Sequence, residues 1–143
     1  MSRQTVRDAM VPEPTTLGVA ASAQDAGRCL ERDDVRAVFV VEDDGRLVGV
    51  ITRKTLVRAV VAEGRDPREV ALREIAEPPL FTLDAALPLD EGFHQLEDHD
   101  LERVPVVEEG GRLVGVLSRA VVQRRLAEDE PPEPDPDPGS VVL

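Results

Sequence analysis

The chain carries the stretch Gly45-Arg46-Leu47-Val48-Gly49-Val50-Ile51-Thr52-Arg53 and repeats it 66 residues later as Gly111-Arg112-Leu113-Val114-Gly115-Val116-Leu117-Ser118-Arg119. The same offset holds without a gap from position 5 to position 58 of the first copy, and more than a third of these 54 pairs are identical. Chance matching in so short a chain would not keep one register. The chain therefore consists of two copies of one structural unit.

The duplication divides the chain into four parts. The first unit covers residues 5–62, a connection covers 63–69, and the second unit covers 70–127. Gly64 and Pro67 interrupt helical structure in the connection. The remaining segment, 128–143, is rich in proline and acidic residues, a composition that predicts a disordered tail.

Each unit predicts the same order of elements, β-α-β-β-α, because β-branched runs alternate with helical patterns. In the first unit we expect strands at 15–17, 37–41 and 47–51, a helix opened by Ser22 or Gln24, and a closing helix at 54–62. In the second we expect strands at 81–83, 104–107 and 113–117, a helix at 91–99 capped by Asp90, and a closing helix at 120–127. Gly45 and Gly111 end the predicted hairpin turns.

One such unit would be marginal alone, since a three-stranded sheet with two helices buries little apolar surface. Packing the two copies about a pseudo-twofold axis would bury both apolar faces. We therefore expect an α/β fold of two pseudo-symmetric units packed together. Aromatic residues are only 2% of the chain, so Val, Leu, Ala and Ile must build its core.

Composition limits the classes of partner. The net charge is −12, and the tail holds six acidic and no basic residues, which leaves −6 on residues 1–127. Nucleic-acid binding needs a basic face, so we expect no nucleic-acid partner and no anionic membrane surface. No apolar run approaches the roughly 20 residues of a membrane span. The N-terminus lacks the apolar region of a signal peptide, and Cys29 is a single cysteine, so we expect a cytoplasmic protein.

The repeated unit resembles a known family. A segment reading Thr5-Val6-Arg7-Asp8-Ala9-Met10-Val11-Pro12, followed by a helix and by residues 38–53, is similar to the cystathionine-β-synthase (CBS) domain. Residues 105–119 of the second unit are typical of it, and two tandem copies resemble a Bateman module. The resemblance covers residues 5–127. It implies a regulatory sensor that binds adenosine nucleotides or S-adenosylmethionine between its repeats and alters an enzyme, channel, transporter or partner.

The resemblance also implies a nucleotide motif after the third strand of each unit: Gly, two apolar residues, Thr or Ser, two more residues, and Asp. Thr52 and Ser118 occupy the hydroxyl positions, but Thr55 and Val121 stand where the ribose-binding Asp is expected. Thr55 can still form one hydrogen bond and Val121 none. An unpaired buried hydroxyl costs about 1–3 kcal/mol, so we favour the cleft that contains Thr52 and Thr55.

Four arginines are candidates for binding phosphate, which suits the guanidinium fork. Arg103 matches a basic position that the family often has before its second strand, and Arg36 lies one residue earlier in the first unit. Arg53 and Arg119 begin the closing helices, whose N-termini favour anions. The alternative is that these arginines are solvated or paired with some of the chain's 29 acidic residues.

The remaining motifs have structural explanations. His94 and His99 are five residues apart and do not share a helix face, so we expect no metal site. Cys29 lies on an apolar helix stripe, where it behaves as a small hydrophobic residue. Gly45 and Gly49 suit a turn and a close packing position. No nucleophile is paired with a base, so we expect no enzyme.

We therefore expect a stand-alone CBS-pair regulator whose ligand is AMP, ADP, ATP or S-adenosylmethionine, acting through an unknown protein effector or a homodimer. A homodimer is predicted from apolar residues on the two closing helices: Val57, Val60, Val61, Val121, Val122 and Leu126. The alternative is a ligand-independent dimerising adaptor whose clefts have degenerated. The missing Asp at Thr55 and Val121 favours this alternative.

Overall fold

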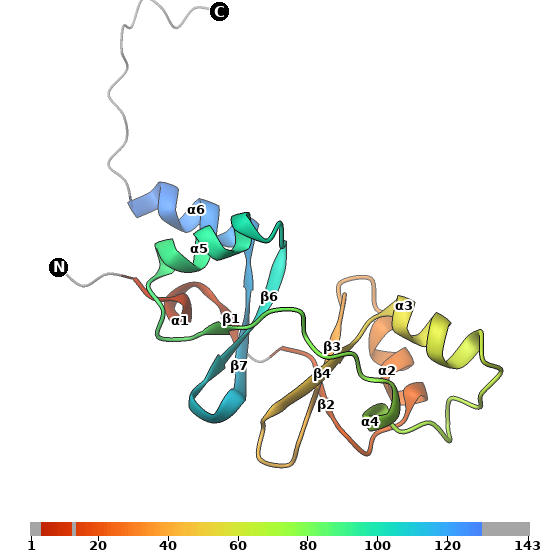
Figure 1. The fold of residues 1–143 in the computed structure, drawn as a ribbon. Helices are drawn as coiled ribbons and strands as arrows, with labels where there is room; N and C mark the ends of the chain where they lie inside the picture. Colours follow the sequence, from red (N-terminus) through yellow and green to blue (C-terminus); the bar gives the residue numbers. More distant parts are fainter. Residues whose placement is uncertain (1–3, 13, 130–143) are drawn as a thin grey trace, which may run out of the picture.

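The computed structural model describes residues 4–12 and 14–129. Two sheets meet at the centre of the molecule, and the longer helices cover their outer sides (Figure 1). In chain order, the elements of the first part are α1 (Val6–Ala9), β1 (Val11–Pro12), β2 (Thr16–Gly18), α2 (Ala23–Leu30), β3 (Val38–Val41), β4 (Leu47–Ile51), α3 (Arg53–Leu56) and a π-helical segment (Val57–Val61). Those of the second part are α4 (Leu72–Ile75), β5 (Leu83–Asp84), α5 (Leu89–Asp98), β6 (Arg103–Glu108), a 3-10 turn (Glu109–Gly111), β7 (Arg112–Ser118) and α6 (Arg119–Asp129).

The two sheets follow the duplicated topology that the sequence predicts. In the first sheet, β2 is parallel to β3, which is antiparallel to β4. In the second sheet, β5 is parallel to β6, which is antiparallel to β7. The second sheet gains a fourth strand, because β1 pairs with β7 and places Val11 opposite Val116. Pro12, which has no N–H, is tolerated there because β1 is an edge strand.

The leading segment of the first repeat, which contains α1, packs on the second repeat. The Val6 N–H donates to the Leu87 carbonyl at 2.8 Å, and the Arg7 N–H donates to the Ala85 carbonyl at 3.0 Å. Val6 is fully buried in the core that contains Leu89. Figure 1 shows α1 beside α5, far along the chain from it.

The leading segment of the second repeat, which contains α4, makes the equivalent contact with the first repeat. The Leu72 N–H donates to the Ala21 carbonyl at 2.8 Å, and the Arg73 N–H donates to the Val19 carbonyl at 3.0 Å. Leu72 and Ile75 belong to the core of the first repeat. The repeats therefore exchange their leading segments, so the packed units differ from the sequence repeats by this segment.

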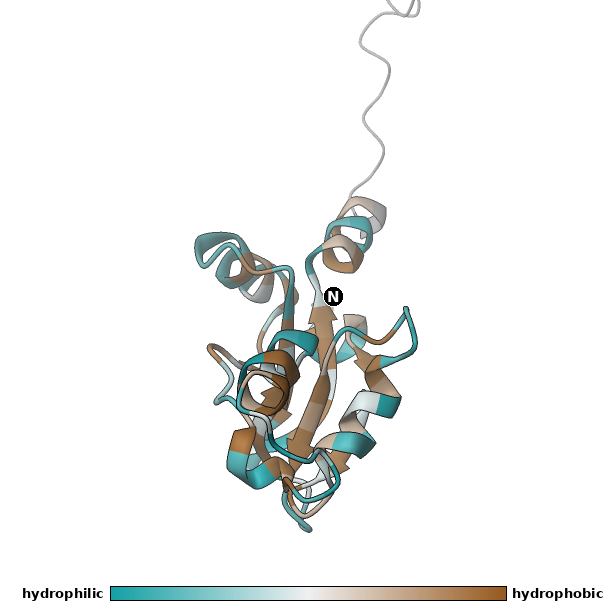
Figure 2. Ribbon diagram, turned by 90° about the vertical axis from the view of Figure 1, so that its right-hand side faces the viewer, coloured by the Kyte–Doolittle hydropathy of each residue, from teal (hydrophilic) through white to brown (hydrophobic). Residues whose placement is uncertain are grey.

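Each half has its own apolar core, built mainly from the residue types that the composition predicts. The first core contains Val19, Ala23, Ala26, Leu30, Val35, Val38, Val40, Ile51, Val60, Val70, Leu72 and Ile75. The second contains Val6, Ala9, Leu83, Ala85, Leu89, Leu96, Val104, Val106, Leu117 and Val122. Figure 2 shows apolar strands at the centre of the fold, while polar residues lie on the helices around them.

Helix α2 begins as the sequence predicts. The Asp25 N–H donates to the Ser22 hydroxyl at 3.1 Å, and the Ser22 N–H donates to the Asp25 carboxylate at 3.1 Å. The backbone and hydroxyl of Ser22 hold the pKa of Asp25 below its ordinary value. This reciprocal pair is a capping box, and it confirms Ser22 as the residue that opens the helix.

Three expectations about helices need correction. Helix α5 begins at Leu89 after Pro88, so Asp90 lies in its first turn and is not the N-cap. A negative charge is favourable there because of the helix dipole. The predicted helix 54–62 is regular only to Leu56 and continues as a π-helical segment. Helix α6 runs to Asp129, two residues into the predicted tail; residues 130–143 of that tail lie outside the described residues.

Two glycines allow the exchanged segments to approach the sheets. A Cβ atom at Gly49 would lie 2.8 Å from the Ala76 Cβ and 2.8 Å from the Glu77 carbonyl. A Cβ atom at Gly115 would lie 2.6 Å from the Met10 sulfur and 2.8 Å from the Val11 carbonyl. Gly49 therefore serves close packing, as predicted, while Gly45 has the positive φ of a turn.

We expect the substitutions G49A and G115A each to lower the free energy of unfolding by about 1–3 kcal/mol, the usual cost of overpacking. Chemical denaturation measures this effect. The control is G18A, because a Cβ atom at Gly18 meets nothing within 4 Å. Unchanged stability of both G49A and G115A would contradict a tight approach of the exchanged segments.

Candidate functional site

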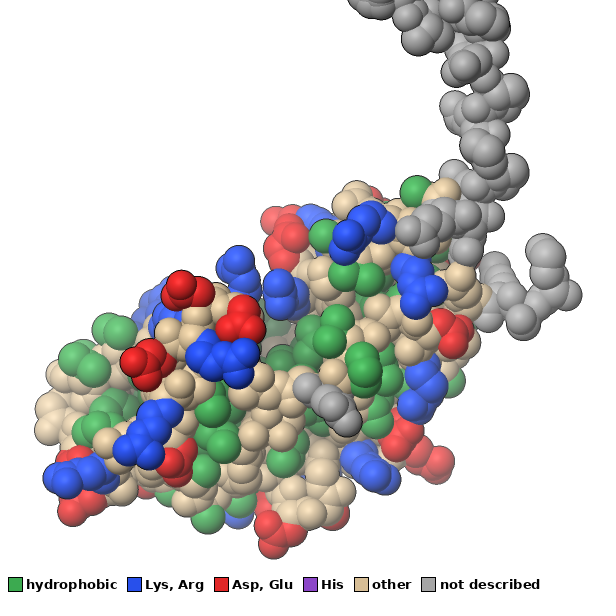
Figure 3. All heavy atoms as spheres, turned by 180° about the vertical axis from the view of Figure 1, so that it is seen from behind, with side chains coloured by type: hydrophobic (Ala, Val, Ile, Leu, Met, Phe, Trp, Pro, Cys, Tyr) green, Lys and Arg blue, Asp and Glu red, His purple; other side chains and the backbone are tan. Residues whose placement is uncertain are grey.

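A pocket of about 580 Å³ lies where the two repeats meet. Small-molecule sites usually enclose about 300–1,000 Å³. Residues of both repeats line the pocket. The described lining is Val11, Pro14, Thr15, Arg32, Asp34, Val35, Arg36, Ala37, Phe39, Val50, Thr52, Thr55, Glu77, Pro78, Pro79, Leu80, Phe81, Leu101, Arg103, Pro105, Val116, Ser118 and Val121. Figure 3 shows a hollow between the two halves, with basic side chains along its rim and hydrophobic ones beside it.

The segments that follow the exchanged helices form part of the pocket wall. The Val50 N–H donates to the Glu77 carbonyl at 2.8 Å, and the Glu77 N–H donates to the Val50 carbonyl at 3.1 Å. This pair fixes the start of the segment 77–81 against β4. The segment beginning at Val11 is fixed in the equivalent way by the pairing of β1 with β7.

The first half of the pocket contains a chain of hydrogen bonds. The Thr55 hydroxyl donates to Glu77 Oε1 at 3.1 Å and accepts from the Thr52 N–H at 3.0 Å. The Thr52 and Thr55 hydroxyl oxygens are 3.1 Å apart. Because the single Thr55 proton goes to Glu77, Thr52 must be the donor in that contact. The Thr55 hydroxyl is thus fully paired, and Thr55 is only 2% exposed.

The second half of the pocket has apolar residues at the equivalent positions. The 66-residue offset matches Thr55 with Val121 and Glu77 with Val11, and all four residues line the pocket. Ser118 matches Thr52 and is half-buried. One half of the pocket therefore has a hydroxyl and a carboxylate at the two positions where the other half has valines.

Arg36 and Arg103 face the pocket from the two repeats, as part of its lining. Both are exposed, and among the described residues neither guanidinium has a hydrogen-bond or ion-pair partner. Arg32 also lines the pocket but pairs with Asp34 at 3.0 Å. The described lining has three basic and two acidic side chains, so it is more positive than the chain as a whole, whose net charge is −12.

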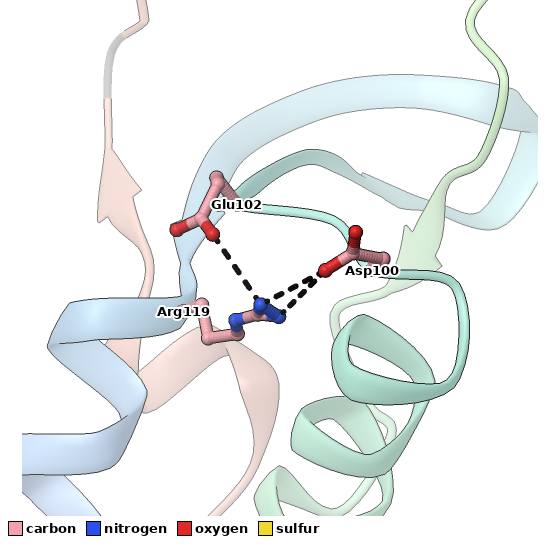
Figure 4. A network of polar contacts seen from close by, with 3 residues as sticks. All are labelled: Asp100, Glu102 and Arg119. Carbon is pink, nitrogen blue, oxygen red and sulfur yellow. Dashed lines mark hydrogen bonds and ion pairs between the residues drawn. The ribbon is translucent and has the colours of Figure 1, made fainter.

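Arg53 and Arg119 are absent from the pocket lining and bond to protein groups. The Arg53 guanidinium donates to the carbonyl of Leu30, the last residue of α2, and, at 2.9 Å, to the Arg32 carbonyl just beyond it. Arg119 pairs with Asp100 and Glu102, each at 3.3 Å (Figure 4). Arg119 therefore follows the alternative that the sequence left open, pairing with acidic residues, whereas Arg53 bonds to backbone carbonyls, which the sequence did not predict.

Of the seven residues that the sequence singled out for a ligand, the structure brings five together at the pocket: Arg36, Thr52, Thr55, Arg103 and Ser118. Sequence reasoning missed Glu77, which lies between α4 and β5 and belongs to the second repeat in sequence. The alignment of the repeats did hold a signal for it. Glu77 aligns with Val11, just as Thr55 aligns with Val121, so the two positions change from polar to apolar together.

The histidines and the cysteine have local contacts. The His99 ring lies 4.5 Å from the Phe81 ring, and its Nδ1 is 2.9 Å from the Gln95 carbonyl at the end of α5. Cys29 is half-buried against the first core, less enclosed than expected. Within residues 4–12 and 14–129, no group of three His, Cys, Asp or Glu side chains is placed to hold a metal ion. No helix of this part of the chain has both the length and the apolar composition needed to cross a membrane.

The apolar residues predicted on the closing helices fall into two groups. Val57 and Val61 are 56% and 71% exposed. Val60 and Val122 are instead buried in the two cores, so the prediction that they lie on an exposed face is wrong. The reason is that each closing helix turns these residues toward its own sheet.

Comparison with known proteins agrees with the duplicated fold. A family model for the CBS domain matches residues 6–62 and again 72–128. Hypoxic response protein 1 from Mycobacterium tuberculosis is 32% identical over 124 residues, which are 87% of this chain and 86% of that protein. These matches confirm the resemblance seen in the sequence.

Solved structures of similar fold include that of Hypoxic Response Protein I with two coordinated zinc ions. It has a TM-score of 0.72 and 31% identity, and covers 87% of this chain and 99% of that one. CBSX2 in complex with AMP has a TM-score of 0.69 and 24% identity over 87% and 97% of the chains. The CBS domain pair of MJ0100, in complex with 5′-methylthioadenosine and S-adenosyl-L-methionine, has a TM-score of 0.67 and 22% identity over 90% and 100%. At these last two identities the likeness is one of fold.

We expect R53A to lower the free energy of unfolding by about 1–3 kcal/mol, because it removes charge-assisted hydrogen bonds to two carbonyls. R36A removes the same charge from a side chain without a described partner, so its effect should stay within about 0.5 kcal/mol. Urea denaturation of both variants measures the difference. Equal stability of R53A and R36A would contradict the structural role of Arg53.

Proposed function

The chain belongs to the CBS-domain family, and we propose that it is a regulatory CBS pair that binds an adenosine-type nucleotide in the pocket between its repeats. The observation that carries the proposal is the pair of guanidinium groups of Arg36 and Arg103, which border one pocket and have no described partner. Unpaired arginines at a cleft in an acidic chain suit an anionic ligand, and the guanidinium fork matches phosphate.

The ligands of similar proteins support the class of molecule. The structure of CBSX2 contains AMP, and that of the MJ0100 pair contains 5′-methylthioadenosine and S-adenosyl-L-methionine. The pocket has room for a molecule of this kind, and Phe39, Pro105 and Leu101 supply apolar surface for a base. We propose a regulatory role rather than an enzymatic one, with the response passed to a protein effector or through a homodimer.

Titration calorimetry with AMP, ADP, ATP and S-adenosylmethionine tests this proposal. We expect at least one of these ligands to bind, and R36A and R103A each to weaken a phosphate-bearing ligand about tenfold or more, since a charge-assisted hydrogen bond is lost. R124A is the control: Arg124 is exposed, has no described partner and lies outside the pocket lining.

Absence of binding by all four ligands at millimolar concentration would contradict the proposal. It would favour the alternative of a ligand-independent dimerising adaptor. The paired state of the Thr55 hydroxyl and the apolar side chain of Val121 are the observations that support this alternative, because neither can bind a ribose hydroxyl.

We also propose that the chain forms a homodimer through the first closing helix. Val57 and Val61 are exposed on its π-helical segment, and Val61 borders a shallow groove of about 400 Å³ shared with Leu56 and Pro67. Adjacent exposed apolar residues of this kind are typical of association surfaces.

The double substitution V57D/V61D should convert the dimer to a monomer in sedimentation velocity at micromolar concentration, because it places two like charges on each side of the contact. The control is R58D, an exposed position on the same segment with no described partner. A wild-type protein that sediments only as a monomer would contradict this surface.

A further inference from the structure

We propose that Glu77, which lies on the segment between α4 and β5, is the residue that binds the neighbouring hydroxyl groups of the ligand's ribose. This inference rests on the proposed function and adds the residue that determines its specificity. It also assigns the sugar to the Thr52 and Thr55 half of the pocket and excludes it from the half that contains Val121.

The hydrogen-bond chain in the first half of the pocket ends on Glu77. Thr52 donates to Thr55, and Thr55 donates to Glu77 Oε1. Every hydrogen-bonding position of the Thr55 hydroxyl is then used, so this hydroxyl orients the carboxylate and cannot bind the ligand itself. Thr55 is therefore a positioning residue.

The Glu77 carboxylate has acceptor capacity left. Its second oxygen has no hydrogen-bond partner among the described residues, and no described Lys or Arg pairs with it. An ionised carboxylate has about four lone-pair positions and accepts only. Two neighbouring hydroxyls are paired donors of the kind that one carboxylate accepts, as acidic residues do for ribose in dinucleotide sites.

A purely structural role for the Glu77 side chain is unnecessary. The backbone of Glu77 is already bonded twice to Val50, at 2.8 and 3.1 Å, which anchors the segment on β4. The equivalent segment is anchored on β7 with Val11 in place of the glutamate. Since a valine suffices there, the carboxylate is not needed to hold such a segment in place.

The apolar pair in the other half strengthens the assignment. Val121 and Val11 replace the orienting hydroxyl and the carboxylate together. A sugar placed in that half would lose its bonds to water and gain no acceptor from these two residues, which is unfavourable. The two halves therefore distinguish the polar and apolar parts of one ligand.

Calorimetry with AMP and 2′-deoxyadenosine 5′-monophosphate tests the inference on three proteins: wild type, E77Q and E69Q. We expect wild type to bind AMP about tenfold or more tightly than the deoxy analogue, because one bond to a charged acceptor is lost. E77Q should lose most of this preference. E69Q carries the same charge change at an exposed linker position outside the pocket lining, so it should keep the preference.

A further variant separates orientation from binding. T55V removes the hydroxyl that orients Glu77 and should reduce the preference for AMP over the deoxy analogue by a smaller factor than E77Q does. The comparison of the two ligands on wild type needs no variant, so it holds even if a substitution impairs folding.

The outcomes also separate this inference from the proposed function. If AMP binds wild type and E77Q retains the full preference, or if wild type shows no preference, the role of Glu77 is wrong while the proposed function stands. If AMP and the other adenosine ligands do not bind wild type at millimolar concentration, both are wrong.

Discussion

The exchange of the two leading segments is the contact on which the rest of the structure depends. Val6 closes the core of the second repeat and Leu72 closes that of the first, and both side chains are fully buried. A three-stranded sheet with two helices is marginal alone, so each repeat relies on a helix that the other supplies. Neither sequence repeat alone contains all the residues of its core. The pair is therefore expected to unfold as one cooperative unit.

The exchange also creates the pocket. A segment that leaves one half to reach the other must cross the space between the sheets: β1 does so beside β7, and Glu77 does so beside Val50 of β4. Gly49 and Gly115 permit the crossing, since a methyl group at either position would meet the passing backbone. A ligand in the pocket would contact both repeats and both crossings. Because binding to the folded form alone stabilises it, such a ligand would strengthen the same exchange that forms its site.

Local patterns in the sequence predicted much of the fold. Alternating β-branched runs gave the strands, Ser22 gave the start of α2, and Gly45 gave a turn, because each depends on residues near in sequence. The exchange was not predictable, since both copies offer the same surface and a repeat does not say which copy a segment packs on. The same limit applies to the site. Thr52 and Arg103 lie near strand ends that the repeat places at the junction, whereas Glu77 reaches Thr55 only through a contact between segments 22 residues apart.

The duplication explains where the two halves could diverge. The exchange requires matching backbone contacts in both halves, which keeps the strand valines and the paired glycines alike. The hairpin tips are held in the same way, with Gly45 close to Arg112 and Gly111 close to Arg46. The side chains in the pocket are not part of these backbone contacts. The change from a threonine and a glutamate to two valines falls on such a pair of side chains, which contact each other in the first half of the pocket. Two equal halves would bind a ligand equally well in two opposite orientations. A symmetric scaffold with an asymmetric pocket is therefore what selection for one ligand in one orientation would produce.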